Sequence, residues 1–520
     1  MSLPRIAVKQ EGKMTKTVSE LDYLKMTAWQ KFCYKFVAFF RSLPIIFLNF
    51  FTKKIPNAAK KVWYTVKGWG VTIGSAAKHG DWKTRTSFVL FGFSQLARKQ
   101  WLRGVLLLLF ELLFILYMAL FGGQYLGLMG SLGRVAQGEV QDPVTGEFYY
   151  TDGDNSLLIL LYGILTITFI LCFVYVWYQN IKSAYGTQQI VEARRNLATA
   201  KEDLKSLADE QYHKTLLGIP LAGLTIFTII PIVFMIFLAF TNYDMEHQPP
   251  TNLFTWIGWD NFKQVFGGSL GEAENFGYTF AKILLWTVIW AFFATFSNFI
   301  LGTIVAIMIN KKGIKFKKLW RTILIVTIAV PQFVSLLLMS QMLGDEGAIN
   351  NLLKSWGVIN ESIPFLSDGT LAKVSIIVVN IWIGIPYTML ISTGILMNIP
   401  EDLYESARID GAGPVKAFFK ITLPYMLHVT APYLITQFIG NLNNFNVIFL
   451  LTGGNPRTLD FAGNAGETDL LITWLYKLVM DKQLYGMASV ISILMFIITA
   501  VVSLIVYNKS GSVKNEEDFM

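Results

Sequence analysis

Long apolar stretches alternate with shorter polar ones along most of this chain of 520 residues. A helix that crosses a bilayer needs about 20 mostly apolar residues to span a hydrocarbon core of roughly 30 Å. The stretches that meet this requirement lie at residues 103–121, 156–178, 215–241, 278–309, 320–343, 373–398, 426–452 and 485–507. The pattern predicts an all-α, polytopic membrane protein with about eight transmembrane helices.

The first hundred residues follow a different pattern, in which aromatic residues mix with Lys and Arg at helix-like intervals. We interpret the stretches 31–51 and 61–78 as amphipathic helices that lie in the inner membrane interface. A ninth span at 36–52 is the alternative, and Arg41 and Pro44 argue against it.

The same patterns divide the chain into four regions. We expect an N-terminal cytoplasmic or interfacial region, then two accessory transmembrane helices with a charged cytoplasmic linker helix at 189–214, then a six-helix core, and finally a cytoplasmic tail. The corresponding residues are 1–102, 103–214, 215–508 and 509–520.

Composition and charge agree with a membrane protein. Hydrophobic residues make up 53% of the chain and charged residues 15%, whereas soluble proteins carry about 25% charged residues. The predicted topology explains the net charge of +9 at pH 7. Of the 44 Lys and Arg residues, 36 lie in the predicted inner segments and six in the outer loops. Since positive loops stay in the cytoplasm, both termini are predicted to be cytoplasmic. Attraction to anionic lipid accounts for the charge, and no nucleic acid partner is expected.

The sequence offers little for catalysis or cofactor binding. It has no GxxxxGK[ST] loop for a nucleotide phosphate, and its two cysteines and four scattered histidines lack zinc-ligand spacing. Glu111 and Lys282 are the candidates for a proton-coupling role, which would make the chain a secondary transporter. We predict no catalytic residue, metal or cofactor in this chain. Its energy would then come from a separate partner, unless it is a channel or scaffold.

The predicted inner loop at 399–424 is longer and more patterned than a tight turn requires. Asn398 is a candidate N-cap for a helix with acidic residues in its first turn. Gly411 and Gly413 predict the end of that helix, because glycine readily adopts a positive φ. A second short helix is predicted at 414–421, so the loop would form a helix–turn–helix on the inner surface of the membrane.

This loop resembles the EAA loop of binding-protein-dependent ABC importer permeases. That motif reads EAA, three residues, G, nine residues, then I-x-LP, and the sequence ESARIDGAGPVKAFFKITLP matches it with Ser406 in place of the first alanine. In that family the loop is the coupling helix that docks on a cytoplasmic ATPase, which binds the ATP and Mg²⁺. The resemblance assigns ATPase coupling to Glu405, Ser406, Ala407, Asp410, Gly411, Ile421, Leu423 and Pro424.

Further blocks are similar to the MalF-type subunit of maltose/maltodextrin importers, which has a type I ABC importer permease core. They include IWIGIPYTMLISTGILMNIPEDLYESA (381–407), NLNNFNVIFLLTGGNP (441–456) and AGETDLLITWLYKL (465–478). The resemblance implies a sugar site near the membrane midplane, formed by Asn380, Ile383, Gly384, Tyr387, Asn441 and Asn444. Asn and Tyr side chains can hydrogen-bond sugar hydroxyls, although intramembrane Asn also bonds neighbouring helices.

The same resemblance implies the partners: a second homologous permease of MalG type, a MalK-like ABC ATPase dimer, an extracellular sugar-binding lipoprotein, and a maltodextrin-type oligosaccharide. Gly440 departs from the family, since it lies where an aromatic residue can stack on sugar. The predicted outer loop at 242–277 is also short, whereas Gram-negative MalF proteins carry a folded domain there, so we expect a Gram-positive plasma membrane. A raffinose- or galacto-oligosaccharide cargo is the alternative within the family.

Overall fold

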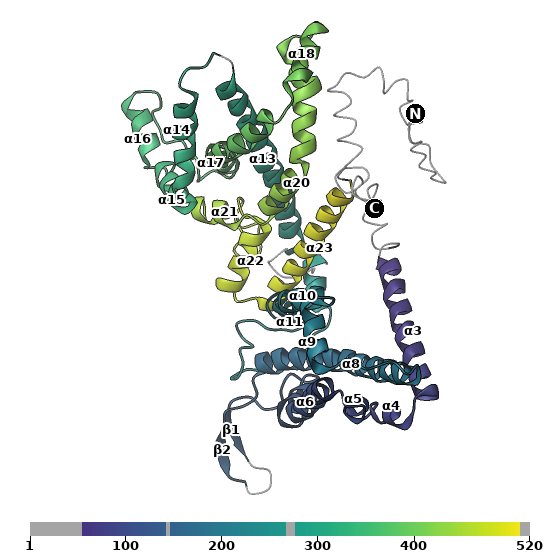
Figure 1. Cartoon of the computed structure of the whole chain (residues 1–520). Helices are drawn as coiled ribbons and strands as arrows, with labels where there is room; N and C mark the ends of the chain where they lie inside the picture. The colour runs from purple at the N-terminus through teal and green to yellow at the C-terminus, as the bar shows by residue number, and fades with distance from the viewer. Residues whose placement is uncertain (1–51, 53–54, 142–145, 267–275, 312, 510–520) are drawn as a thin grey trace, which may run out of the picture. The chain divides into compact units, whose positions relative to one another are not determined.

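The computed structural model describes residues 52, 55–141, 146–266, 276–311 and 313–509 (Figure 1). The predicted amphipathic stretch 31–51 lies outside the described residues, as does the alternative ninth span apart from Thr52. The chain forms two compact units, Met1–Val66 and Lys67–Met520. The boundary falls inside the first described helix, and nearly all of the described residues belong to the second unit.

Before the predicted core, the named elements of the described residues are helices and one β-hairpin. Strands β1 and β2 pair antiparallel, with Gly138 opposite Thr151. The elements of this part are α3 (Ile55–His79), α4 (Trp82–Thr86), α5 (Phe93–Ala97), α6 (Trp101–Tyr117), the π-helical turn η2 (Met118–Gly122), α7 (Gly123–Leu128), β1 (Gly138–Gln141), β2 (Phe148–Thr151), α8 (Ser156–Glu192) and α9 (Ala200–Ala208).

In the predicted core, every named element within the described residues is a helix or a helical turn, and irregular segments such as 452–470 connect them. Its elements are α10 (Tyr212–Leu224), the π-helical turn η3 (Thr225–Ile229), α11 (Ile230–Leu238), α12 (Asp260–Phe266), α13 (Phe276–Asn310), α14 (Lys317–Ala329), α15 (Gln332–Met342), α16 (Ala348–Ser355), α17 (Gly369–Met397), α18 (Glu401–Ile409), α19 (Pro414–Ala417), the π-helical turn η4 (Phe418–Thr422), α20 (Leu423–Leu442), α21 (Phe445–Leu451), α22 (Leu471–Met480) and α23 (Tyr485–Lys509).

All eight predicted spans are helical, which confirms the all-α polytopic fold, but two of them are broken. Six long apolar helices lie at Trp101–Leu128, Ser156–Glu192, Thr215–Leu238, Phe276–Asn310, Gly369–Met397 and Tyr485–Leu504 among the described residues. The fifth predicted span is the pair α14 and α15, which is bent by 88°, and the seventh joins 414–442 to α21 with a bend of 44°.

Each break has a local cause. Pro331 has no N–H to donate and disfavours a helical conformation at the residue before it, and Val330 is accordingly extended at ψ 124°. In the seventh span, the side chain of Asn444 accepts a hydrogen bond from the Val447 N–H and begins α21. The second helices of the two broken spans contact each other. Helix α15 packs against α21, and the Ser340 hydroxyl donates to the Leu451 carbonyl at 2.7 Å.

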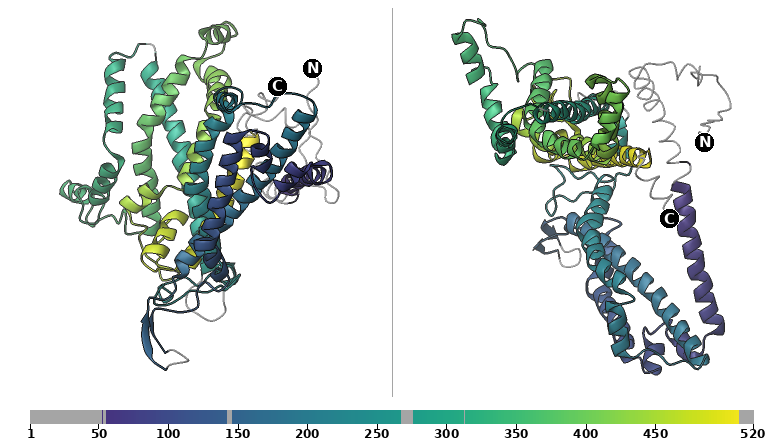
Figure 2. Two further views of the ribbon diagram at one scale, coloured as in Figure 1. Left: turned by 60° about the horizontal axis from the view of Figure 1, so that its bottom comes forward. Right: turned by 45° about the horizontal axis from the view of Figure 1, so that its top comes forward.

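The helices α13 and α17 make the most extensive helix contact in the described part of the chain, and α14 and α20 lie beside them (Figure 2, left, teal and green). Hydroxyl groups join α13 to α17: Thr303 and Ser392 are 3.0 Å apart, and Thr388 donates to the Asn298 carbonyl at 2.9 Å. In apolar surroundings such interhelical hydrogen bonds contribute about 1 kcal/mol each. These two helices therefore form one packed and hydrogen-bonded pair.

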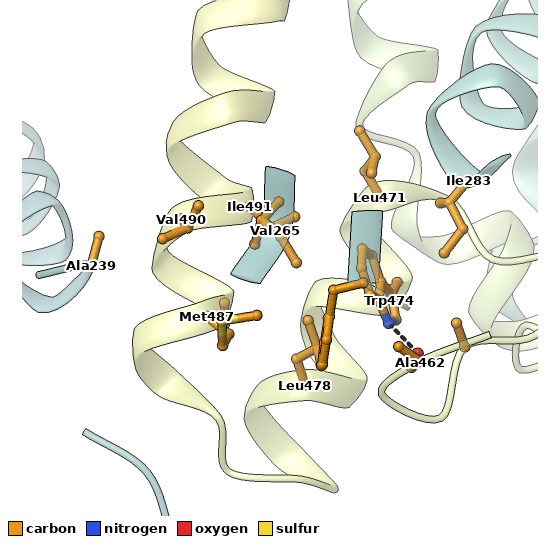
Figure 3. Close-up of a cluster of buried hydrophobic side chains, with 13 residues drawn as sticks. Ala239, Val265, Ile283, Ala462, Leu471, Trp474, Leu478, Met487, Val490 and Ile491 are labelled. Atoms are coloured by element: carbon orange, nitrogen blue, oxygen red, sulfur yellow. Dashed lines mark hydrogen bonds between the residues drawn. The ribbon is translucent and has the colours of Figure 1, made fainter. Parts of the chain in front are cut away.

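At the end of the bundle that holds α22, a cluster of buried side chains joins α22 and α23 to α12 and α13 (Figure 3). Trp474 is fully buried there, and its indole N–H donates to the Ala462 carbonyl at 3.1 Å. Figure 1 shows α22 toward the opposite end of the bundle from α18. By the predicted topology, this cluster closes the outer face and α18 lies at the cytoplasmic face.

The segment between α3 and α6 folds back against α6 and α8. Arg98, which is almost fully buried, pairs with Asp81 at 2.7 Å. Burial alone would raise the pKa of Asp81, but hydrogen bonds from Thr84 and Arg98 outweigh it and lower that pKa below its ordinary value. Deeper in the predicted first span, the carboxylate of Glu111 accepts a hydrogen bond from the Phe91 N–H at 2.8 Å. Glu111 thus binds a neighbouring backbone segment.

Candidate functional site

The loop 399–424 contains helix α18, which is the predicted coupling helix, and a sharp turn after it. The turn depends on Gly411, whose φ of +73° is left-handed, and the Ala412 N–H closes it on the Ala407 carbonyl at 2.8 Å. A glycine suits position 411 because a side chain would strain this left-handed conformation. Gly413 is extended, so it carries no such requirement.

Two details of the predicted loop are wrong. Asn398 ends α17, and α18 begins at Glu401 directly after Pro400, because the chain turns sharply between the two helices. The second helix also does not stop at Ile421. It runs from α19 through the π-helical turn η4 into α20, and Pro424 is the second residue of α20, directly after that π-helical turn.

Helix α18 is joined to two of the long helices. Asn398 and Pro400 connect it directly to α17. The hydroxyls of Tyr404 and Thr422 lie 2.8 Å apart, which joins α18 to the start of α20, and Thr422 is buried. The rest of the loop is open: Glu405, Ser406 and Asp410 are exposed, and Ile409 is 86% exposed. A cavity of about 1100 Å³ lies between α18 and the ends of α13 and α17.

The predicted sugar residues on α17 share one face, at intervals of three and four residues. Asn380 is 7% exposed, and its Nδ2 atom is buried without an acceptor in the described structure. Ile383 and Gly384 are half-buried, and Tyr387 is 49% exposed. The buried amide of Asn380 is a hydrogen-bond donor with no protein partner, which is the property expected of a ligand contact.

The other two predicted sugar residues lie at the break between α20 and α21. Asn444 donates from Nδ2 to the Asn441 side-chain oxygen at 3.3 Å, and Asn441 donates to Thr295 Oγ1 at 3.0 Å. Both amides therefore already make intramolecular hydrogen bonds. Among the described residues, no hydrogen bond joins Asn380 or Tyr387 to this pair. The structure thus places the six residues in two groups.

Sequence reasoning missed three residues beside the α17 group. Asn298, Tyr433 and Gln437 line a cavity of about 60 Å³ together with Gly384 and Tyr387. A Cβ atom at Gly384 would overlap the side-chain amide of Asn298. Asn298 therefore fills the space beside Gly384, a residue that the resemblance assigned to the sugar site. The signal that could have pointed to Asn298 is its place as an isolated asparagine in the apolar run AFFATFSNFILG.

A second feature that sequence reasoning missed lies at the predicted outer end. Lys477 and Asp469 form an ion pair at 2.7 Å in which both side chains are buried. Burial raises the pKa of Asp469, although Lys477 and the Gly466 N–H act in the opposite direction. Lys477 is one of the six basic residues that the sequence places in the outer loops. In the structure it is buried, and its bond to Asp469 holds the 453–470 segment against α22.

The comparisons with known proteins agree with this architecture. Residues 298–510 match the family described as binding-protein-dependent transport system inner membrane component. The galactooligosaccharides transport system permease protein GanP of Bacillus subtilis is 35% identical over 431 residues, which cover 82% of this chain and 97% of that protein. The maltodextrin transport system permease protein MdxF of the same species is 34% identical over 440 residues, which cover 82% of this chain and 95% of that protein.

A third relative is the maltose/maltodextrin transport system permease protein MalF of Escherichia coli K12, which is 35% identical over 268 residues, 51% of each chain. The chain belongs to the binding-protein-dependent family of ABC importer permeases, so the resemblance read from the sequence is confirmed. It is a multi-pass membrane protein and a transport component rather than an enzyme.

Proposed function

We propose that this chain is a permease subunit of an ATP-driven importer that carries maltodextrin-type oligosaccharides into the cell. The observation that supports this most strongly is the exposed helix α18, which fits the EAA pattern, ends at the left-handed Gly411, and is joined to α17 and α20. These are two of the helices that carry the sugar residues of the proposal.

In this proposal a homologous second permease completes the pathway, and two copies of an ATPase dock on the two coupling helices. The ATPase dimer binds ATP and Mg²⁺, and an extracellular lipoprotein delivers the sugar. Both termini lie in the cytoplasm of a Gram-positive cell. The roles of Glu405, Ser406, Ala407 and the other loop residues are those assigned from the sequence.

The geometry gives this coupling a mechanical route. A force on α18 reaches α17 through the short connection at Asn398 and Pro400, and reaches α20 through the Tyr404–Thr422 contact. Interhelical hydrogen bonds also fix α17 to α13. In this proposal α13, α17 and α20 therefore move as one body. Closure of the ATPase dimer would then shift the population from inward-facing to outward-facing, since each partner favours one state.

Galacto-oligosaccharides are the second candidate cargo, and the likeness to GanP favours them. To test the function, the importer is purified from its native membrane, reconstituted in proteoliposomes with its binding lipoprotein, and supplied with ATP. Uptake of labelled maltotriose above that of galactotriose supports the maltodextrin proposal, and the reverse supports the second candidate. ATP-independent uptake of either sugar would contradict an ABC importer.

A further inference from the structure

A small cavity with polar groups in its wall lies at the junction of α13, α17 and α20, which contact one another. Its volume is about 60 Å³. The cavity therefore has room for a hydroxyl or hydroxymethyl group of a ligand. Asn298, Tyr387, Tyr433 and Gln437 supply polar groups to its wall.

Asn298 provides an unused hydrogen-bond acceptor at this cavity. Its Oδ1 atom is buried and has no hydrogen-bond partner in the described structure. The neighbouring hydroxyl of Thr388 does not satisfy it, because that hydroxyl donates to backbone carbonyls, including that of Asn298 itself at 2.9 Å. A buried amide oxygen without a donor is unfavourable, so the site favours a ligand that brings an O–H.

The position of this acceptor depends on Gly384. Any side chain at position 384 would overlap the Asn298 amide, so this amide fits against α17 because Gly384 has no side chain. One helical turn away on the same face of α17, Asn380 carries a buried and unpaired Nδ2 donor. Gly384 thus has an unused acceptor against it and an unused donor one helical turn before it on α17, and Tyr387 belongs both to the proposed sugar residues and to the cavity wall.

We infer that this cavity, which we call the Asn298 subsite, receives one exocyclic hydroxyl or hydroxymethyl group of the oligosaccharide and determines which sugars pass. The sugar O–H donates to Asn298 Oδ1, and Gln437 and Tyr433 line the opposite side on α20. The inference rests on the proposed sugar-import function. It adds a specificity-determining residue on α13, a helix to which the sequence assigned no sugar contact.

The test uses the complete importer in proteoliposomes, with maltotriose and a series of its monodeoxy analogues that each lack one hydroxyl. Asn298→Leu removes the acceptor at nearly constant volume, and Gly384→Ala displaces it. Thr303→Val is the matched control, because it removes a hydrogen bond between α13 and α17 at a position that does not line the cavity.

We expect one analogue to have a KM about 5- to 10-fold above that of maltotriose with the unmodified protein, as for the loss of a single hydrogen bond. With Asn298→Leu, the KM for maltotriose itself should rise by the same factor. The KM for that analogue should stay at the value it has with the unmodified protein. Thr303→Val should leave the ranking of the analogues unchanged, since a purely structural contact does not discriminate among sugars.

Two results overturn the inference in different ways. If maltotriose is transported but Asn298→Leu changes the KM of all analogues by the same factor, Asn298 is structural and the import function stands. If the unmodified importer transports no maltotriose, the series is repeated with galactotriose and its deoxy analogues. Failure to transport either sugar contradicts the proposed function, and the Asn298 subsite with it.

Discussion

The two ends of the helical bundle are built on opposite principles. At the predicted outer end, the 453–484 segment folds on itself around the buried Trp474 and the buried Asp469–Lys477 pair. At the predicted cytoplasmic end, α18 leaves Glu405 and Ser406 exposed and Ile409 86% exposed. The outer segment is held by its own buried contacts, although Leu459 in it is fully exposed. The ordered and exposed helix α18 is the surface that the proposed function assigns to the ATPase.

The largest effect that would test this contrast is expected at the buried ion pair. Lys477→Ala leaves the carboxylate of Asp469 buried and unpaired, which should lower the free energy of unfolding by about 3–5 kcal/mol. Glu405→Ala, at an exposed position of α18, should change it by less than about 0.5 kcal/mol. Thermal unfolding of both variants in the same detergent measures the difference. Equal effects would mean that the two ends do not differ in this way.

The next largest effect compares two left-handed glycines, one at each end. Gly454 has φ +81° and a Cβ atom there would overlap Asp469 and Lys477, whereas a Cβ atom at Gly411, with φ +73°, meets nothing. Alanine at either position costs about 1–2 kcal/mol for the backbone conformation. Gly454→Ala should therefore destabilise the protein clearly more than Gly411→Ala, as measured by the midpoint of thermal unfolding. A smaller loss at Gly454 would contradict the crowded packing around it.

A smaller effect is expected where α18 meets α20. Tyr404→Phe removes one hydrogen bond, so we expect a loss of about 0.5–1.5 kcal/mol in stability. If the contact transmits force, the same variant should lower the sugar transported per ATP hydrolysed, and Thr422→Val should reproduce this loss. The double variant should be no worse than either single one. Additive losses would show that the two hydroxyls act separately.

The smallest effect is expected at the Arg98–Asp81 pair, in which Asp81 is partly exposed. Its contribution to stability can be compared with that of the buried Lys477–Asp469 pair. Because the pKa of Asp81 is lowered in the folded state, its contribution is complete above the unfolded pKa and is lost as the pH falls through the lower, folded value. Unfolding monitored from pH 6 down into the acid range should therefore show a stability loss that Asp81→Asn removes. The loss should remain below about 1 kcal/mol, since the carboxylate is partly solvated. A loss as large as that of Lys477→Ala would contradict the account of burial.

The sequence predicted well those features that local patterns determine. Apolar length located all eight spans, and the left-handed Gly411 follows from the lack of a Cβ atom. Pro331 was visible in the fifth span, but the 88° bend it accompanies depends on how α15 packs against α21. Asn398 was assigned to the wrong helix, because an asparagine between two helices can end one or begin the other.

The candidate site was less predictable, because its contacts join distant parts of the chain. Gly384 fits a sugar contact when α17 is read alone, and only the structure shows that Asn298, which is far away in the sequence, fills the space beside it. Likewise, nothing local indicates that Lys477 is buried against Asp469. The roles of Asn380, Tyr387, Asn441 and Asn444 in sugar binding remain predictions.

The measurement that tests the central claim most directly is gentle affinity purification of the full chain from its native membrane, with the co-purifying proteins identified and counted. The account predicts one homologous permease and two copies of an ABC ATPase. With Glu405→Lys or Gly411→Trp, the chain should remain in the membrane and keep the second permease, while the bound ATPase and ATP-driven uptake are lost. A chain that purifies without any ATPase in several detergents, or that keeps ATPase and uptake in both variants, would contradict the assignment of α18 as the coupling helix.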